Sequence, residues 1–388
     1  MVSEKLSIYM HPYIYYKGRY GGIARYVCEL AEELWQQQHK IYLPIRSSES
    51  IYLQQSKFFP YANECFLSPS MVDKGIASIL RIMGYGEKAA RHLKRVDALN
   101  ALKNGAYDVI HPSYTNCTEI LPYVKNTPLV VTVHDMIHEL YPESFSPKDP
   151  SSYRKKLFAH SADRIIAISN QTKADLIHYF GIKEEKIDVI YHGNSLTLPA
   201  NYESVDISLP ERYILFVGHR HGYKNFESLL TAFSALVTED DSLHLICAGG
   251  PPFSKDELLK LHELGIQQKV EQRFVNDEEL AILYNRCLLF VYPSIYEGFG
   301  LPILEAFACR APVLCARASC FPEIASDGAA YFTPGNNDEL THAIRKYINS
   351  SDECKKLRFL GDQRLQNFTW KQCAANTLAS YRAAMAAH

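Results

Sequence analysis

The sequence predicts an α/β protein built from two doubly wound, Rossmann-like domains of similar size. The first observation is its length, because 388 residues exceed the size at which one hydrophobic core keeps growing. The second is an alternation of short β-rich runs with helix-length amphipathic stretches, which is typical of parallel β-α-β units. The third is an irregular segment near the middle of the chain that separates two such series.

Six apolar runs in each half of the chain predict the strands of two parallel sheets. They lie at residues 5–10, 40–45, 107–112, 129–134, 164–169 and 186–191, and at 213–218, 243–250, 269–275, 288–294, 311–316 and 329–334. Residues 195–210 carry two prolines and little periodicity, so they are interpreted as the linker, with a boundary near residue 203. A last amphipathic helix is expected from about residue 367 to residue 388.

Composition excludes several classes of protein. The 41 basic residues nearly balance the 43 acidic ones, so no global field favours nucleic acid as a partner. The ten cysteines include no C-x-x-C pair of the kind found in zinc or redox sites, and we expect most of them to be buried. No run approaches the ~18 apolar residues of a membrane span, which favours a cytoplasmic location.

Residues 81–103 predict a basic amphipathic helix with six cations among apolar residues. The cations are Arg81, Lys88, Arg91, Lys94, Arg95 and Lys103. One reading is a solvated helix face that packs on its own domain. The other is an acceptor-binding or membrane-facing surface, which would make the protein peripheral at the cytoplasmic face of a membrane.

The strongest functional signal is the segment 294–305, SIYEGFGLPILE, which follows the apolar strand that ends at residue 292. It indicates a strand, a glycine loop and a helix. Gly298 and Gly300 let the backbone approach a ligand closely, and the helix opening at Leu301 presents free N–H groups and the positive end of the helix dipole. A diphosphate suits this position.

Glu297 and Glu305 flank this loop at a spacing of E-x7-E. Carboxylates placed in this way could reach different parts of one elongated ligand, the sugar hydroxyls at one end and a ribose at the other. A dipole-stabilised carboxylate at a helix start beside an ordinary surface glutamate is the structural alternative. The intervening sequence GFGLPIL favours a ligand-binding role for the two glutamates over this structural alternative.

Further candidates follow the predicted strands of the first half. His134 closes an apolar strand and is expected at the carboxyl edge of the sheet, where open α/β sheets bind ligands. Gly21 and Gly22 precede a predicted helix, where a glycine turn lets an acceptor or a phosphate approach. A lone histidine is more often structural, and a glycine pair by itself is only a turn.

The segment YEGFGLPILEA resembles the E-x7-E signature of retaining GT-B glycosyltransferases, in particular family four. In order and spacing, the segments GGIARYVCELAEEL, TVHDMI, ADRIIAISNQTKADL, VIYHGN, LFVGHRHGYKN, LYNRCLLFVYPS and FPEIASDGAAYFTP are similar as well. The resemblance implies the GT-B fold, with two facing Rossmann-like domains and a cleft between them. Residues 1–203 would bind the acceptor, residues 204–366 the nucleotide sugar, and residues 367–388 would return to the first domain.

The resemblance also implies roles for single residues. Glu297 would contact the donor sugar, Glu305 the ribose, and His134 the donor or the acceptor. Lys224 and Arg220 would neutralise the departing diphosphate, as a metal ion otherwise does, and the sequence has no D-x-D triplet. Backbone groups of the donor site would come from Gly21, Gly22, Gly218, Gly298, Phe299, Gly300 and Leu301.

The family likeness implies a retaining, metal-independent transfer of a hexose from a nucleotide diphosphate-sugar, which is a substrate, so no cofactor is expected. Analogy with envelope-polysaccharide mannosyltransferases suggests mannose from GDP-mannose, and a glycan or lipid-linked glycan as acceptor. Two residues depart from the family pattern: His219 replaces an arginine, and Arg310 replaces a glycine after the signature helix.

A noncatalytic partner subunit that only binds sugar nucleotide is the alternative, and His219 is its best support. A nicotinamide dehydrogenase is set aside, because GHRHGYKN lacks the G-x-G-x-x-G spacing.

Overall fold

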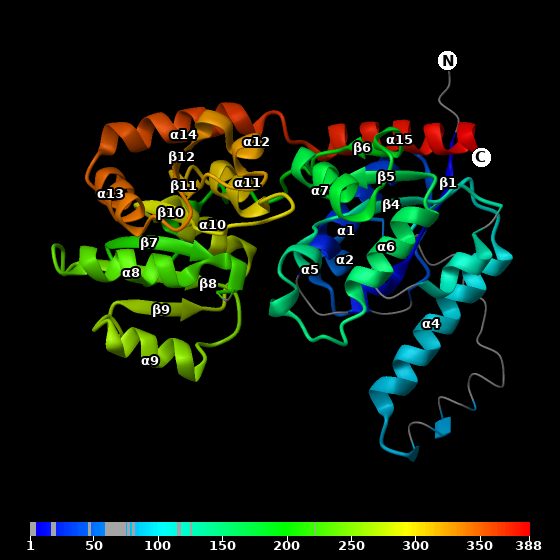
Figure 1. The fold of residues 1–388 in the computed structure, drawn as a ribbon, viewed down its shortest axis with the longest axis horizontal. Coiled ribbons are helices and arrows are strands. Elements are labelled where there is room, and N and C mark those ends of the chain that lie inside the picture. The colour runs from blue at the N-terminus through cyan, green and yellow to red at the C-terminus, as the bar shows by residue number, and fades with distance from the viewer. Residues whose placement is uncertain are drawn as a thin grey trace. The chain divides into compact units, whose positions relative to one another are not determined.

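The computed structural model describes residues 5–16, 21–45, 48–58, 75, 78–79, 82–114, 118–124, 126–220 and 222–388. The chain forms two compact units (Figure 1). Unit 1 comprises Met1–Tyr191 and Trp370–His388, and unit 2 comprises His192–Thr369. From the sequence, the boundary between the two domains was expected near residue 203, and the C-terminal helix that returns to the first domain was expected from residue 367.

Unit 1 contains parallel strands in the orders β2-β1-β3 and β4-β5-β6. Single parallel bridges, Ile110 to Leu129 and Ser113 to Thr132, join the β3 and β4 segments. All six predicted strands are confirmed. They are β1 (Ser7–Met10), β2 (Lys40–Tyr42), β3 (Val109–His111), β4 (Val130–Val133), β5 (Arg164–Ala167) and β6 (Ile187–Val189).

The helices of unit 1 are α1 (Gly22–Gln36), α2 (Ile51–Gln55), α4 (Gly86–Asn104), α5 (Ile137–Leu140), α6 (Ser151–Ser161), α7 (Asn170–Phe180) and α15 (Trp370–Ala387). Short 3-10 helices lie at Pro12–Tyr16, Thr118–Tyr123, Pro142–Ser144 and Glu184–Lys186. The last helix, α15, packs on α1 and β5. Leu30 and Leu34 of α1 share one apolar core with Ile8 of β1 and with Tyr381 and Ala384 of α15.

Unit 2 holds one six-stranded parallel sheet in the order β9-β8-β7-β10-β11-β12. Its strands, all predicted, are β7 (Arg212–Val217), β8 (Leu243–Ala248), β9 (Val270–Arg273), β10 (Leu289–Tyr292), β11 (Val313–Ala316) and β12 (Ala329–Phe332). The chain runs outward from β7 in one direction and from β10 in the other. In such sheets, the crevice at the carboxyl ends of the two central strands is the expected ligand site.

The helices of unit 2 are α8 (Phe226–Val237), α9 (Lys255–Glu263), α10 (Asp277–Arg286), α11 (Leu301–Ala308), α12 (Phe321–Ala325), α13 (Asn337–Ile348) and α14 (Ser351–Leu365). Short 3-10 helices lie at Tyr202–Ser204, Gly222–Lys224 and Ser326–Gly328. Reciprocal capping boxes begin two helices: Ser254 with Glu257 begins α9, and Asn276 with Glu279 begins α10.

Arg310, which stands where the family pattern has glycine, follows the signature helix in the left-handed conformation, with φ of 58°. A side chain in this region costs on the order of 1 kcal/mol relative to glycine. Two backbone hydrogen bonds close the helix end, from Arg310 N–H to Phe307 and from Ala311 N–H to Ala306, at 3.0 and 2.8 Å. The missing glycine is therefore tolerated locally.

The cysteines of the described residues are all buried and free of disulfides, as expected. Cys65 and Cys117 lie outside the described residues. Within the described parts of the chain, none of the helices has both the length and the apolar character needed to cross a bilayer.

Candidate functional site

The loops that follow β7 and β10 meet at the carboxyl edge of the unit 2 sheet. Ile295 N–H donates to the Tyr223 carbonyl at 2.8 Å, which joins the two loops. Lys224, at the end of a 3-10 turn after β7, forms an ion pair with Oε1 of Glu297. Both side chains are mostly shielded, with 14% and 13% exposed. The structure therefore brings together two residues that the sequence analysis selected, 73 positions apart.

Glu297 is held through its side chain and its main chain. The Tyr292 hydroxyl donates to Glu297 Oε1 at 2.8 Å. The Ser319 hydroxyl donates to the Glu297 carbonyl at 2.7 Å and accepts from the Glu297 N–H at 3.3 Å. The Cys320 thiol also donates to that carbonyl, at 3.2 Å. The carboxylate is consequently presented from a fixed loop.

The glycine loop leads into α11 as predicted. Gly300 caps this helix with φ of 94°, a conformation that favours glycine. A Cβ on Gly300 would lie 3.3 Å from side-chain atoms of both Ile303 and Phe321. Leu301 is the first residue of the helix, and Pro302 lies in its first turn. The helix N-terminus therefore presents N–H groups beside the Glu297 loop, as an anion requires.

Phe299 and Glu305 are placed by neighbouring aromatic residues. The Phe299 ring is buried and stacks on His192 at 4.9 Å between centroids, so its backbone is the part of this residue suited to ligand contact. Glu305 lies on α11, where its Oε2 accepts a hydrogen bond from the buried Tyr284 hydroxyl at 3.3 Å.

Arg220 points into the loop that follows β8. Its side chain is 1% exposed and donates to Glu257 Oε1 at 2.7 Å and to the Pro251 carbonyl at 2.6 Å. Burial by itself raises the pKa of Glu257, but hydrogen bonds from Arg220 and Ser254 outweigh it, so the pKa is lowered overall. Arg220 also lines a groove of about 660 Å³ between α8 and α9.

Gly218 begins the β7 loop with φ of 120°, and its N–H donates to the Ala248 carbonyl at 2.9 Å. The neighbouring His219 is exposed. The sequence predicted that both Lys224 and Arg220 would face the diphosphate. In the structure, Lys224 contacts Glu297, whereas Arg220 is bonded to Glu257 and Pro251 and holds the loop that follows β8.

In unit 1, His134 lies directly after β4, and the two glycines lie at the start of α1. Gly21 is the N-cap of α1 in an extended conformation and Gly22 is the first residue of the helix, so the predicted helix start is confirmed. His134 follows β4 and is buried, with its ring edge-on to Tyr26 at 5.0 Å. Burial lowers the pKa of His134 to about 4, opposed by the charge of Asp135 and reinforced by Lys155.

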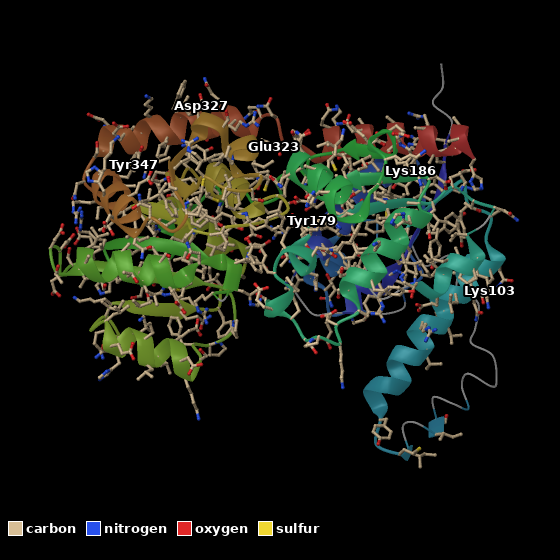
Figure 2. The ribbon with its side chains drawn as sticks, viewed as in Figure 1. Lys103, Tyr179, Lys186, Glu323, Asp327 and Tyr347 are labelled. Carbon is tan, nitrogen blue, oxygen red and sulfur yellow. The ribbon has the colours of Figure 1, made fainter. Side chains whose placement is uncertain are left out.

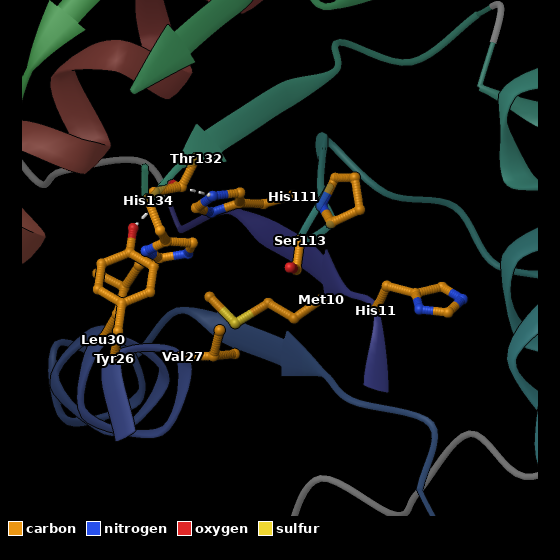
Figure 3. A pocket seen from close by; sticks show the side chains of 10 residues that line it. Met10, His11, Tyr26, Val27, Leu30, His111, Ser113, Thr132 and His134 are labelled. Atoms are coloured by element: carbon orange, nitrogen blue, oxygen red, sulfur yellow. Dashed lines mark hydrogen bonds between the residues drawn. The ribbon is translucent and has the colours of Figure 1, made fainter. Parts of the chain in front are cut away.

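A small cavity of about 10 Å³ lies beside His134, at the lower limit of the size that can hold one water molecule (Figure 3). A hydrogen-bond chain runs along it. Tyr26 and Thr132 hydroxyls lie 2.9 Å apart, Thr132 lies 2.8 Å from His111 Nε2, and His111 Nδ1 lies 2.6 Å from the Tyr381 hydroxyl. This chain joins α1, β4, β3 and α15. This chain was not predicted from the sequence, although His111 lies near the end of a predicted strand, as His134 does.

A buried ion cluster lies next to His134. The Lys155 side chain is 0% exposed and contacts Glu139 Oε2 at 2.7 Å and Asp135 Oδ1 at 3.5 Å. Asp135 also accepts from the Tyr114 hydroxyl at 3.3 Å and from Ile137 N–H at 3.1 Å. Burial alone raises the pKa of Asp135, but the charge of Lys155 and the hydrogen bond from Ile137 N–H lower it overall. The cluster fixes the segment that carries His134.

Unit 1 should lose stability as the pH falls from 6.5 to 5. Burial lowers the pKa of His111 to about 3 and that of His134 to about 4. The unfolded chain therefore binds more protons below pH 6.5, and each histidine removes up to about 1.4 kcal/mol of stability per pH unit. Both tryptophans, Trp35 and Trp370, belong to unit 1, so their fluorescence in urea titrations reports its unfolding.

A variant that cannot titrate at one site, His111→Gln, should show a shallower pH dependence than the wild type. A urea midpoint that stayed constant from pH 7 to pH 5 in the wild type would show that these histidines are not buried and neutral.

Two family models match consecutive parts of the chain. Residues 20–197 match the model described as "Glycosyltransferase Family 4", and residues 199–362 match "Glycosyl transferases group 1". These ranges contain the glycine turn of unit 1 and the Glu297 loop of unit 2.

Curated relatives and solved structures agree with these matches. The O-antigen chain mannosyltransferase B of Escherichia coli is 29% identical over 65% of this chain and 70% of its own length. An MMP α-(1→4)-mannosyltransferase of Mycolicibacterium hassiacum is 29% identical over 78% and 77%. The sucrose-phosphate synthase structure from Thermosynechococcus elongatus superposes with a TM-score of 0.70 at 21% identity, over 99% of this chain and 100% of that one.

The two family models account for most of both units, and the structural likeness shows the GT-B fold over nearly the whole chain. The chain therefore belongs to glycosyltransferase family four and is a nucleotide-sugar-dependent glycosyltransferase.

Proposed function

We propose that this enzyme transfers a hexose, with retention of anomeric configuration and without a metal ion, from a nucleotide diphosphate-sugar to a glycan or lipid-linked glycan. The observation that carries the proposal is the contact of Lys224 with Glu297 beside the N-terminus of α11. Positive charge and free N–H groups there suit a diphosphate, and a carboxylate next to them suits a sugar.

Four side chains of unit 2 have separate roles in this proposal. Glu297 binds the sugar hydroxyls, and Glu305 binds the ribose. Lys224 and the N–H groups from Gly298 to Leu301 stabilise the departing diphosphate. Arg220 supports Lys224 by fixing the loop after β8, since its guanidinium is already occupied by Glu257 and two carbonyls.

The acceptor is proposed to bind at the carboxyl ends of the unit 1 strands, near His134 and the Gly21–Gly22 turn. Its hydroxyl attacks the anomeric carbon on the face from which the phosphate leaves, and the hydroxyl proton passes to that phosphate. GDP-mannose is the first candidate donor, because the similar curated proteins include mannosyltransferases.

The purified chain should consume one sugar nucleotide from a panel that contains GDP-mannose and UDP-sugars, in excess chelator. Lys224 and the helix N-terminus supply the positive charge that a metal ion would otherwise provide. The measurement is release of nucleoside diphosphate, with a thermal-shift panel to identify the donor that binds.

Loss of activity in chelator with rescue by magnesium or manganese would contradict the metal-independent mechanism. Binding of a sugar nucleotide with neither transfer nor hydrolysis would favour the noncatalytic partner subunit instead.

A peripheral membrane contact is proposed for the segment that leads into α4. Its large apolar side chains are exposed: Ile79, Ile82, Met83 and Tyr85, with Ile82 86% exposed. Four such residues within seven positions form a cluster rather than scattered exposure. Cationic residues follow on α4. Lys103 of this helix, labelled in Figure 2, lies over the Tyr123 ring at 4.6 Å, and Arg95 pairs with Glu119 at 3.0 Å.

A helix is confirmed in this region as α4, Gly86–Asn104, and it begins five residues later than predicted. Arg81 and the side chains of Lys88, Arg91 and Lys94 lie outside the described residues. The exposed apolar residues lie next to a helix that carries basic residues, and this combination is typical of segments that bind at a membrane interface.

The protein should pellet with anionic liposomes at low salt and be released at high salt, because the cations attract the lipid headgroups over a screened distance. Ile82→Glu should weaken the pelleting. The matched control is Phe359→Glu on α14, which changes an exposed apolar residue of unit 2. Pelleting unchanged by Ile82→Glu and by charge reversal at Arg91, Lys94 and Arg95 would exclude this surface.

A further inference from the structure

Each of the two signature carboxylates is bonded to a buried tyrosine that the proposed reaction does not use. The Tyr292 hydroxyl donates to Glu297 Oε1 at 2.8 Å, and the Tyr284 hydroxyl donates to Glu305 Oε2 at 3.3 Å. Tyr292 ends β10 and Tyr284 lies in α10, so the two donors come from different elements.

The aromatic rings of these tyrosines are held by packing. Phe290 stacks on Tyr292 at 5.7 Å between centroids and meets Tyr284 edge-on at 5.1 Å. On another side, Tyr292 contacts Phe321 at 5.1 Å. Neither ring has appreciable exposure. One aromatic row therefore fixes both hydroxyls, and the positions of the carboxylates follow from it.

The direction of each hydrogen bond is set by charge and burial. Burial raises the pKa of Tyr292 well above its usual value, and the charge of Glu297 raises it further. Burial and Glu305 act on the pKa of Tyr284 in the same way. Both phenols therefore stay protonated and donate to their glutamates.

The bonds also leave one carboxylate oxygen of Glu297 for a ligand. Tyr292 and Lys224 both contact Oε1. Among the described residues, none forms a hydrogen bond or ion pair with Oε2. A carboxylate bonded in this way cannot rotate without losing both bonds, so Oε2 keeps one orientation.

We propose that Tyr292 and Tyr284 are positioning residues, the first orienting Glu297 for the transferred sugar and the second orienting Glu305 for the nucleotide. This inference rests on the proposed function, because it assigns each tyrosine the role of its glutamate. The two hydroxyls therefore affect different kinetic quantities.

The test compares tyrosine-to-phenylalanine variants of the full chain by turnover and by titration with GDP and with UDP. Tyr292→Phe should lower kcat roughly tenfold or more, with the Kd of the diphosphate within about twofold, because a hydrogen bond to a charged group is lost near the reacting sugar. Tyr284→Phe should raise that Kd roughly threefold to tenfold and leave kcat within about twofold.

Tyr213→Phe is the matched control, because Tyr213 is equally buried in the same sheet and its hydroxyl donates to the Leu283 carbonyl at 2.8 Å, not to a glutamate. It should lower the melting temperature to a similar extent as the other two variants without changing kcat or Kd. A loss of folding alone would therefore appear in all three variants.

A second measurement separates positioning from general structure. In a Glu297→Gln background, Tyr292→Phe should lower kcat by less than about twofold, because the group it orients is already impaired. An equal loss in both backgrounds, or wild-type kcat in Tyr292→Phe, would overturn the inference. A wild type that binds neither GDP nor UDP and consumes no sugar nucleotide would overturn the proposed function together with it.

Discussion

Glu297→Gln is expected to lower kcat by roughly 30-fold to 1,000-fold, equivalent to about 2–4 kcal/mol of transition-state stabilisation. Positive charge develops on the sugar as the bond to phosphate breaks, and the Glu297 carboxylate is proposed to lie next to it. Glutamine keeps an oxygen that can accept from Tyr292 but removes the negative charge that faces the sugar. The affinity for the free nucleoside diphosphate should change little.

Glu305→Gln is the matched comparison, because it makes the same change at the other end of the donor. A charge-assisted hydrogen bond to the ribose exists in the ground state and in the transition state alike. Its loss should cost on the order of 1–3 kcal/mol, seen chiefly as a raised donor KM and a weaker diphosphate Kd. Steady-state kinetics and calorimetric titration of both variants, after a check of folding, provide the measurements.

The two roles would be reversed if Glu297→Gln lost diphosphate affinity while Glu305→Gln lost only turnover. Glu297→Gln also removes the negative partner of Lys224, so the diphosphate affinity of this variant must be compared with that of the wild type. A diphosphate that bound slightly more tightly to Glu297→Gln than to the wild type would fit this release and leave the assignment of Glu297 intact.

Local patterns in the sequence were sufficient to predict the strands of both units, although the six strands of unit 1 form two three-stranded sheets. Each strand of unit 2 is an apolar run bounded by turn residues, and parallel strands buried on both faces require such runs. The Glu297 loop was predicted for the same reason, since Gly300, Pro302 and the run after them mark a helix start over a few residues. Signals of this kind are contained in consecutive positions.

The partners of the site residues could not be predicted from single positions, because they are distant in sequence. Arg220 and Lys224 look equivalent in the sequence, yet Glu257 on α9 holds one and Glu297 holds the other. Ser319, 22 positions after Glu297, clamps that loop and gives no motif signal of its own. Such contacts depend on how helices pack on the sheet, which periodicity does not specify.

The buried ion cluster of unit 1 was equally invisible, because Lys155 lies in a polar stretch that predicts a solvated helix face. Its complete burial between Glu139 and Asp135 is a property of the tertiary structure. Lys155→Met is expected to destabilise unit 1 by about 3–5 kcal/mol at pH 7, because it leaves two shielded carboxylates without their cation. Urea titration followed by the fluorescence of Trp35 and Trp370 measures the loss.

The control is Lys173→Met, which breaks an ion pair with Glu184 at 2.9 Å. Glu184 is 72% exposed, so the loss of this pair should cost at most about 1 kcal/mol.

The two variants also differ in pH dependence. The folded-state pKa of Asp135 is lowered, so in the wild type its stabilising contribution is complete above the unfolded value of 3.8 and is lost only as the pH falls below that value, through the folded-state pKa. Without Lys155, burial favours the protonated carboxyl group, so the deficit of Lys155→Met should shrink between pH 7 and pH 4 as protonation removes the uncompensated charge. A deficit no larger than that of Lys173→Met at pH 7 would show that Lys155 is hydrated and that the cluster does not fix the segment carrying His134.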